Sequence, residues 1–478
     1  MNTSLGIALL AFFVLLFAIA LWSRGRVRNA EDYLVAGRRL PLSLSAATLF
    51  ATWFGAGTML TATDEVRDSG LRATALEPIG AGLCLVVAGL FFASRLWRMH
   101  LITLPDFYRR RFGLRAEILA SIIMVPGYFG WIAAQFVALA GILELFWGIP
   151  FGHGLWVVAG IGTAYTLLGG MWSVTLTDAA QLVFILVGLA VLAVTVMAEL
   201  AGSGPLWTAL SRLAEGMPAD KLTLIPTENF ASFVGWVSVL AIGVLGNIPG
   251  QDLTQRMFAS RTADIARSAC VIAGVAYVAL GFVPVLSGLA ADVLRVDTGD
   301  TATLPALAVA LLSPPMQIVF VLAVTSAVMS TIESAILAPS TVLSNNLLLK
   351  AWPRQPLLRL SYGATLTIAA ASLGVAYLGR DAYELLETAY AVGMVGLFVP
   401  LTIGLYSTRG GESAAIAAMA AGILIWGTHL ALGWEFFGGP WLKDIGLPQE
   451  LAATGFGWLA YEVMAHRRAS GVAERTTE

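Results

Sequence analysis

The chain is a succession of apolar runs of about twenty residues, separated by short polar breaks. Of its 478 residues, 58% are hydrophobic and 12% are charged, and the mean hydropathy is +0.80. A soluble domain carries about 25% charged residues, so this composition indicates a membrane protein. Because the bilayer core has no water to bond free backbone groups, each spanning run must be helical. We therefore expect an all-α polytopic protein with about 13 transmembrane helices, at residues 5–22, 41–63, 74–97, 116–146, 151–168, 173–199, 231–249, 265–291, 305–346, 358–378, 384–406, 412–432 and 450–466.

Lys and Arg residues are distributed unequally between the polar breaks. Of the 28, we assign 21, Arg256 among them, to one set of alternate breaks and 7 to the other set. The seven are Arg67, Arg72, Arg212, Lys221, Arg295, Arg380 and Lys443. An excess of Lys and Arg is typical of cytoplasmic loops. We therefore predict a multi-pass protein of a bacterial-type inner (plasma) membrane, with its N-terminus outside and its C-terminus cytoplasmic.

Little in the sequence indicates chemistry other than transport. The net charge of −2 does not favour nucleic acid as a partner. Cys84 and Cys270 fall inside apolar runs, and the four His residues show no spacing typical of metal ligands. No P-loop, hydrolase motif or kinase motif is present. We therefore expect a protein that is not an enzyme, needs no cofactor and binds no nucleic acid.

Residues 51–58, Ala-Thr-Trp-Phe-Gly-Ala-Gly-Thr, interrupt the second apolar run near its middle. An unsatisfied backbone group costs several kcal/mol in hydrocarbon, so irregular backbone survives there only where it lines a cavity or binds something. Transporters build ion and substrate sites from such broken helices at the membrane midplane. This interruption therefore predicts a transport site.

A second interruption, at residues 243–251, breaks the seventh run with three glycines and a proline. If the second run is core helix one, the seventh run is core helix six, and this spacing predicts a five-plus-five inverted repeat. We expect a single transport domain, 1–478, with repeats at 41–199 and 231–406. Residues 1–40 then form an additional helix and a cytoplasmic loop, and 407–478 form the C-terminal helices and a short cytoplasmic tail. The alternative is that the glycines only allow close helix packing.

Within the ninth run, three hydroxyl residues cluster with a carboxylate, at Ser330, Thr331, Ser334 and Glu333. Positions 327, 330, 331 and 334 follow i, i+3, i+4, i+7 spacing and share one helix face. Hydroxyl and carbonyl oxygens are hard ligands, which suit a small hard cation such as sodium. The alternative is that these hydroxyls bond to carbonyls of the preceding turn of their own helix.

Three further carboxylates lie in or beside apolar runs, at Asp178, Glu77 and Glu387. Carboxylates inside a membrane are costly and are functional by default. Asp178 also suits a second interpretation, a helix-start carboxylate favoured by the helix dipole. Glu77 and Glu387 either face an aqueous vestibule or extend to the membrane interface.

Together these motifs resemble the sodium:solute symporter family over about residues 31–410. The matching pieces are the break at 51–58, Ile102-Thr103-Leu104-Pro105-Asp106-Phe107, the block from Gly169-Gly170 to Asp178, the segment from Gln251 to Arg256, and the pair Ser330-Thr331. The resemblance implies a LeuT-like core of two inverted five-helix repeats. In this family, carbonyls of the first core helix and hydroxyls of the eighth bind sodium, which implies sodium ligands at Ala51, Phe54, Ala327, Ser330 and Thr331. Some members of the family bind a second sodium, and the matching positions here are Asp178, Glu333 and Ser334, which implies a possible second cation. The carboxylate at Glu333 could bind either a cation or a proton.

Within the family, the motifs are most similar to those of the high-affinity choline transporters. Trp53 and Trp131 match aromatic positions of their choline cage, which holds a quaternary ammonium by cation–π attraction. This chain has Gly250 and Ala81 where the choline transporters have a tryptophan and a tyrosine. The resemblance implies substrate contacts at Trp53, Thr58, Glu77, Trp131, Gly250 and Gln251. One interpretation is a cationic or amine-bearing solute; the other is that both tryptophans only pack or gate.

We therefore predict a sodium-coupled secondary symporter that imports a small organic solute by alternating access. Its partners would be the solute, the sodium ion as coupling ion and the lipid bilayer. The alternatives are a sodium-dependent solute sensor, a proton-coupled transporter and a channel-like transporter.

Overall fold

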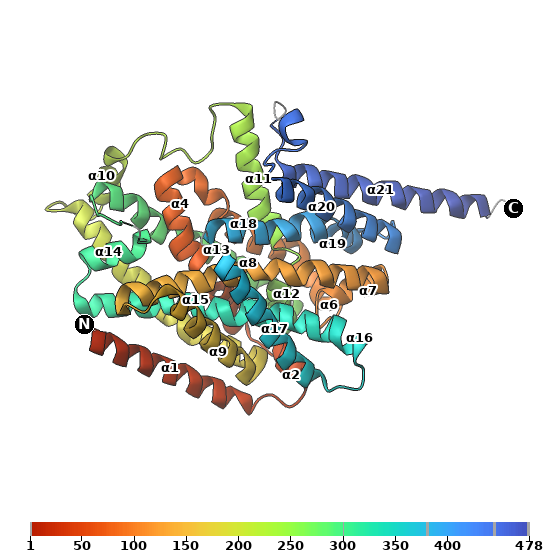
Figure 1. Ribbon diagram of the computed structural model, residues 1–478, viewed down its shortest axis with the longest axis horizontal. Coiled ribbons are helices and arrows are strands. Elements are labelled where there is room, and N and C mark those ends of the chain that lie inside the picture. Colours follow the sequence, from red (N-terminus) through yellow and green to blue (C-terminus); the bar gives the residue numbers. More distant parts are fainter. Residues whose placement is uncertain (1, 300, 379–381, 443–445, 476–478) are drawn as a thin grey trace.

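The computed structural model describes residues 2–299, 301–378, 382–442 and 446–475. Within these ranges the chain is helical without β-strands, and two isolated β-bridges join Leu40 to Ser260 and Phe436 to Pro448. The expected all-α fold class is confirmed. Figure 1 shows the helices gathered into one bundle, with α1 along an edge and α21 extending to the C-terminus.

The helices of the first half, with short 3-10 or π segments labelled η, are α1 (Asn2–Arg24), α2 (Ala30–Val35), η1 (Ala36–Arg38), α3 (Leu42–Trp53), η2 (Gly57–Thr61), α4 (Ala62–Ser69), η3 (Leu71–Ala75), α5 (Ile79–Val87), η4 (Ala88–Ala93), α6 (Ser94–Arg98), α7 (Pro105–Arg111), α8 (Leu114–Trp147), α9 (Phe151–Ala201) and α10 (Thr208–Gly216). Those of the second half are α11 (Phe230–Gly246), α12 (Gln251–Ala259), α13 (Ala263–Val293), α14 (Thr303–Leu311), α15 (Pro314–Val342), η5 (Leu343–Leu348), α16 (Leu349–Ala351), α17 (Leu357–Leu378), α18 (Ala382–Gly393), η6 (Met394–Phe398), α19 (Val399–Tyr406), α20 (Glu412–Leu432), η7 (Gly439–Trp441) and α21 (Gln449–Arg475).

Among the described residues, 10 helices are long and apolar enough to cross a membrane, or up to 11 if the bent pair α11–α12 is one span. Two expected spans are not in this set. The run 41–63 is divided between α3 and the η2–α4 segment, and the run 450–466 lies within α21. The count of thirteen is therefore not confirmed and stays a prediction.

The apolar runs 305–346 and 116–146 are longer than the roughly 20 residues that one span needs, and they form different structures. The run 305–346 contains a short helix, α14, before the long α15, whereas 116–146 lies within the single 34-residue α8. The adjoining runs 151–168 and 173–199 form two spans, Phe151–Leu168 and Gly170–Ala201, which lie within α9 and are separated by a sharp kink at Gly170. Gly170 has φ 56° and ψ −153°, a backbone conformation that favours glycine because it has no Cβ.

The centre of the bundle is α15, which packs against α3, α8 and α9. Its most apolar window is 83% buried inside the protein, compared with 28% for α1 at the edge. A helix that is buried on all sides presents every side chain to other helices. The hydroxyls of α15 therefore face protein and not lipid.

Charged side chains pair at two opposite ends of the bundle. At the end formed by α4, α10 and α14 (Figure 1), Asp292 accepts Arg67 at 2.7 Å and Lys221 at 3.3 Å, and Arg72 pairs with Glu228 at 2.9 Å. At the end formed by α6, α7 and α16, Glu117 pairs with Lys350 at 2.5 Å. This grouping agrees with the two sets of loops expected from the sequence, although Arg380 and Lys443 lie outside the described residues. Which end faces the cytoplasm stays a prediction.

Both expected interruptions are present. The first separates α3 from η2 and α4, and the second separates α11 from α12, which are bent by 40°. The two breaks meet, because the indole Nε1 of Trp53 at the end of α3 donates to Oδ2 of Asp252 in the first turn of α12, at 2.8 Å. The division into repeats at 41–199 and 231–406 stays a prediction.

Candidate functional site

The break in α3 is made at Phe54, whose φ of −79° and ψ of 68° end the helix. Gly55 and Gly57 lie beside this break, but neither has a positive φ. Gly55 instead allows a close approach, since a Cβ there would overlap the hydroxyl of Thr331. A Cβ at Gly57 would meet only the side chain of Leu386, at 3.1 Å, and the end of Glu77 at 3.8 Å.

This break leaves two carbonyl oxygens of α3 without their helical partners. An α-helix would pair the carbonyls of Ala51 and Thr52 with the N–H groups of Gly55 and Ala56. The N–H of Gly55 instead donates to the carbonyl two residues back, at 2.9 Å, and that of Ala56 donates to Oε1 of Gln135, at 2.9 Å. The oxygens of Ala51 and Thr52 are therefore available to another element.

Two hydroxyls of α15 donate hydrogen bonds to these carbonyl oxygens. Ser330 Oγ lies 2.7 Å from the carbonyl oxygen of Ala51, and Thr331 Oγ1 lies 2.8 Å from that of Thr52. Both hydroxyls also reach back to the carbonyl of Ala327, at 2.9 and 3.0 Å, which is the alternative considered from the sequence. Five uncharged oxygens of α3 and α15 thus converge, a donor set that suits a hard cation such as sodium.

Four of the five expected sodium ligands meet in this cluster, and Phe54 does not join the hydrogen bonds between α3 and α15 among the described residues. Its ring stacks on Phe50 with centroids 4.8 Å apart and meets Tyr277 edge-on at 5.5 Å. Thr52 supplies the further carbonyl, which the sequence reasoning missed.

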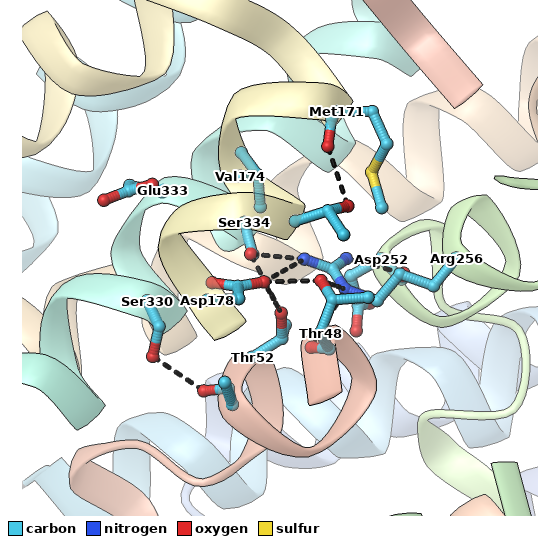
Figure 2. A network of polar contacts seen from close by, with 12 residues as sticks. Thr48, Thr52, Met171, Val174, Asp178, Asp252, Arg256, Ser330, Glu333 and Ser334 are labelled. Carbon is cyan, nitrogen blue, oxygen red and sulfur yellow. Dashed lines mark hydrogen bonds and ion pairs between the residues drawn. The ribbon is translucent and has the colours of Figure 1, made fainter. Parts of the chain in front are cut away.

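A second polar network surrounds the buried carboxylate of Asp178 on α9 (Figure 2). Its Oδ2 accepts the hydroxyl of Thr48 and lies 3.4 Å from the hydroxyl of Thr52. The hydroxyl of Thr52 lies 3.0 Å from that of Ser334 on α15. Asp178 and Ser334, two of the three residues expected at a second cation, therefore belong to one network.

Glu333, the third residue expected there, points elsewhere. Consecutive residues of a helix are about 100° apart around its axis, so Glu333 and Ser334 face different neighbours. The carboxylate of Glu333 accepts the hydroxyl of Thr177 at 3.2 Å, and Figure 2 shows it apart from the cluster around Asp178. Its role as a cation or proton ligand stays a prediction.

Arg256 of α12 is the residue in this network that the sequence reasoning missed. We had counted it among the basic residues of a loop, but it lies in a helix and is 1% exposed. Its guanidinium donates to Ser334 Oγ, to Thr48 Oγ1 at 3.2 Å and to the carbonyl of Asp252 at 2.9 Å, and its Nη2 lies 3.7 Å from Asp178 Oδ2 (Figure 2). The sequence signal was the arginine one turn after Asp252, directly beyond the break in the seventh run.

The expected solute contacts divide into separate groups. Trp53 is held by Asp252, whose Oδ1 also accepts the hydroxyl of Tyr128 at 2.6 Å. Tyr128 lines a pocket of about 40 Å³ with Trp131 and Gly250, between α8, α18 and the break before α12. This pocket brings Trp131 and Gly250 together, but its volume suits about one water molecule. A solute would need these walls to move apart.

Thr58 and Glu77 form another group, deeper in the bundle. Glu77 is 2% exposed, and its carboxylate accepts three hydroxyls, those of Tyr277 at 2.6 Å, Thr58 at 3.1 Å and Tyr390 at 3.1 Å. Of these, Tyr390 also lines the pocket beside Trp131. Glu77 is therefore buried and fully paired, and it faces the solute pocket only through Tyr390.

Gln251 lies away from the pocket lining and helps to close one end of the bundle. Its Oε1 accepts the N–H of Leu104 at 2.7 Å. Nearby, Asn346 beyond α15 donates to Asp106 at 2.9 Å and to Glu117 at 2.8 Å. These bonds tie the segment before α8 to α12 and to the end of α15.

The opposite end has a cavity of about 950 Å³, bounded by α4, α8 and the segment before α14. Its carboxylates are Asp64, Glu65, Asp68 and Glu144. Among the described residues that line it, Arg67 is the one basic side chain, and Arg67 is paired with Asp292. Burial raises the pKa of Asp64 above its ordinary value, and a hydrogen bond from Thr303 opposes this shift. The cavity is therefore acidic overall.

Comparison with known proteins gives relatives that are transporters. The human high affinity choline transporter 1 is 29% identical over 364 residues, which cover 71% of this chain and 61% of that protein. The sodium/pantothenate symporter of Escherichia coli is 27% identical over 449 residues, covering 90% of this chain and 91% of that one. The chain thus spans less than two thirds of the length of the choline transporters that it matches.

Solved structures share the fold at low sequence identity. A sodium-coupled sialic acid symporter in a substrate-bound outward-open state has a TM-score of 0.79 at 15% identity, covering 96% of both chains. Mhp1 in an inward-facing conformation has a TM-score of 0.55 at 16% identity, covering 92% of this chain and 95% of that one. A family model for the sodium:solute symporter family matches residues 33–422. This match covers most of the chain, including both breaks and the hydroxyl pair of α15, and the chain belongs to the sodium:solute symporter family.

Proposed function

We propose that this protein is a sodium-coupled symporter that imports a small organic solute by alternating access. The observation that carries the proposal is the contact of Ser330 and Thr331 with the freed carbonyls of Ala51 and Thr52. These oxygens, with the carbonyl of Ala327, are the proposed sodium ligands. Sodium would replace the hydrogen bonds between hydroxyls and carbonyls, because each hydroxyl can turn its proton away and offer a lone pair.

The proposed ion and solute sites share structural elements, which accounts for coupling between them. Ala51 and Thr52 bind the ion at the end of α3, and Trp53, the next residue, is fixed by Asp252 of α12. Sodium binding would hold α3 against α15 and so fix Trp53 beside Tyr128. If both ligands favour this arrangement, each raises the affinity of the other by the same factor.

The residues around the pocket favour a small organic cation as the solute. Trp53 and Tyr128 bond to the carboxylate of Asp252, and the ring of Trp131 lies beside that of Tyr128 with centroids 5.9 Å apart; aromatic faces attract cations. The acidic cavity at the end of α4 would raise the local concentration of cations before they reach these rings. Glu77, which also accepts the hydroxyl of Thr58, would then act by holding the pocket wall through Tyr390, and Gln251 would act at the closed end through Leu104.

We further infer that the end with the large cavity faces the outside of a bacterial-type inner membrane. Arg67, Arg72 and Lys221 lie at this end, as the uneven distribution of Lys and Arg requires. The opposite end is held closed by the bonds of Gln251 and Asn346. This arrangement fits an outward-facing state, from which the bundle would rock to open the cytoplasmic end.

A thermal-unfolding screen of the purified protein tests the proposal. Choline, betaine, glucose and pantothenate would each be added in NaCl and, separately, in KCl. A ligand of the native state at one hundred times its Kd adds about 2.7 kcal/mol of apparent stability. We expect one of these solutes, with choline the first candidate, to raise the unfolding temperature more in NaCl than in KCl.

The double variant Ser330→Ala/Thr331→Ala should lose this difference between the two salts. Thr367→Ala is the matched control, because the Thr367 hydroxyl bonds only to its own helix, on the exposed face of α17. The proposal fails if sodium has no effect on the unfolding temperature of the natural protein, or an equal effect in the double variant.

A further inference from the structure

We propose that the guanidinium of Arg256 is a tethered cation that fills the second cation position beside Asp178, so that this protein binds one sodium ion, at Ser330 and Thr331. This inference rests on the proposed function and specifies its ion count. It assigns Arg256 a role as a positioning residue that determines how many ions accompany the solute.

The first argument is that the guanidinium uses the oxygens that a second ion would need. Its Nη2 donates to Ser334 Oγ and lies 3.7 Å from Asp178 Oδ2. Its Nε lies 3.2 Å from the hydroxyl of Thr48 and 3.3 Å from the carbonyl of the same residue. A sodium ion bound to Asp178 and Ser334 at this point would have to displace the guanidinium from both.

The second argument is charge. Asp178 and Arg256 are both buried, at 0% and 1% exposure, and a buried carboxylate needs a compensating cation. Arginine stays protonated in proteins and offers several fixed donors, so it supplies this charge permanently. Two further carboxylates are buried in this region: Asp252 takes its side-chain hydrogen bonds from Trp53 and Tyr128 and binds Arg256 through its backbone carbonyl, and Glu333 accepts the hydroxyl of Thr177. Among the described residues, Arg256 is the basic side chain that pairs with Asp178.

The third argument is that the arginine cannot leave with the solute. Arg256 is anchored in α12, and its contacts join Thr48 of α3, Asp178 of α9 and Ser334 of α15. A mobile ion at this point would move with the transport cycle, whereas a tethered one only holds the four helices together. Sodium at Ser330 and Thr331 is then the ion whose binding changes with the state of the bundle.

One carboxylate oxygen of Asp178 allows a different arrangement, in which a second sodium ion binds beside Arg256. Asp178 Oδ1 has no hydrogen-bond partner among the described residues, so a second sodium ion could bind there together with Arg256. The two arrangements predict different numbers of bound ions. They also differ in what happens when the guanidinium is removed.

The test is equilibrium binding of radiolabelled sodium, without solute, to the purified full-length protein. We expect about one site per chain and a Hill coefficient of about 1, since that coefficient cannot exceed the number of sites. Arg256→Gln leaves Asp178 uncompensated, and should raise the count to about two sites. The pair Asp178→Asn/Arg256→Gln, which removes both charges, should return it to about one.

Arg267→Gln is the matched control, because Arg267 is an exposed arginine of the next helix, α13, and its loss should leave the count at about one. Two sites in the natural protein would overturn the inference, as would an unchanged count in folded Arg256→Gln. If Arg256→Gln does not fold, the count in the natural protein decides alone. A count of zero in the natural protein would instead contradict the proposed sodium coupling itself, so the two failures are distinguishable.

Discussion

Asp252 is the residue at which the proposed solute site meets the buried polar network. Its carboxylate accepts the indole N–H of Trp53 at 2.8 Å and the hydroxyl of Tyr128 at 2.6 Å, and its carbonyl accepts Arg256. The hydroxyl of Tyr128 in turn accepts the N–H of Asp252, at 3.1 Å. One side chain therefore fixes the orientation of two of the three aromatic rings that we propose for the solute, those of Trp53 and Tyr128.

Tyr128→Phe removes this hydroxyl and keeps the ring. It leaves a buried carboxylate oxygen and a buried N–H group without a partner, which costs about 1–3 kcal/mol. We expect the Kd of the solute, measured in NaCl, to rise roughly 5- to 150-fold, with the sodium affinity changed much less.

Tyr377→Phe is the matched control, because its hydroxyl bonds to the carbonyl of Gly152 on the exposed side of α17. An equal loss of solute affinity in both variants would contradict the role of Tyr128. So would a loss of sodium affinity as large as the loss of solute affinity.

At the scale of single residues, the sequence predicted which side chains lie together better than it predicted the conformation of the backbone. The spacing of Ser330 and Thr331 placed both hydroxyls on one face, and they do lie together. The choice between the carbonyls of Phe54 and Thr52 depends on the backbone angles at the break, which no residue type determines. Arg256 was missed because a charged residue between apolar runs is assigned to a loop. Its proximity to Asp178 depends on how α12 packs against α9, which the sequence does not show.

At the scale of elements, the break in α3 depends on how closely it approaches α15. Gly55 lies where a Cβ would overlap the hydroxyl of Thr331 and would come within 2.8 Å of Gln135 Oε1. Gly57, two residues later, has more room, since its Cβ would meet the flexible end of Leu386 at 3.1 Å. The two glycines of this break are therefore not equivalent.

Gly55→Ala should weaken sodium binding more than Gly57→Ala does. Overpacking at a tight contact costs typically about 1–3 kcal/mol, and here it would push Thr331 away from the carbonyl of Thr52. The measurement is the sodium concentration that gives half of the sodium-dependent rise in unfolding temperature, in each variant. Equal values for the two variants would contradict the assignment of the close contact to Gly55.

The sequence predicted that both helices break, because glycine and proline in apolar runs mark irregular backbone. It did not predict that Phe54 would make the first break, since an aromatic residue has no local preference for that role. It predicted the two spans at 151–168 and 173–199, which the structure has as Phe151–Leu168 and Gly170–Ala201, but it did not predict that a single kink at Gly170 would separate them. Such outcomes depend on the neighbouring helices, here on the contact of Gly170 with Tyr33 of α2.

At the scale of the whole molecule, the helical bundle has a cavity at one end and a closed network at the other. The cavity of about 950 Å³ lies at the end with α4, and the bonds of Gln251 and Asn346 lie at the end with α7 and α16. The proposed sodium ligands lie between them, on the central helix α15. The fold class was predictable from the apolar runs, whereas this asymmetry between the ends was not, because it belongs to one state of the bundle.

The most direct test of the central claim is uptake into proteoliposomes of the solute that the unfolding screen identifies. An inward sodium gradient should drive the internal solute concentration above the external one, and Ser330→Ala/Thr331→Ala should abolish this accumulation. Thr367→Ala should accumulate solute as the natural protein does. Solute that enters equally well without sodium, or that never exceeds its external concentration, would contradict sodium-coupled symport.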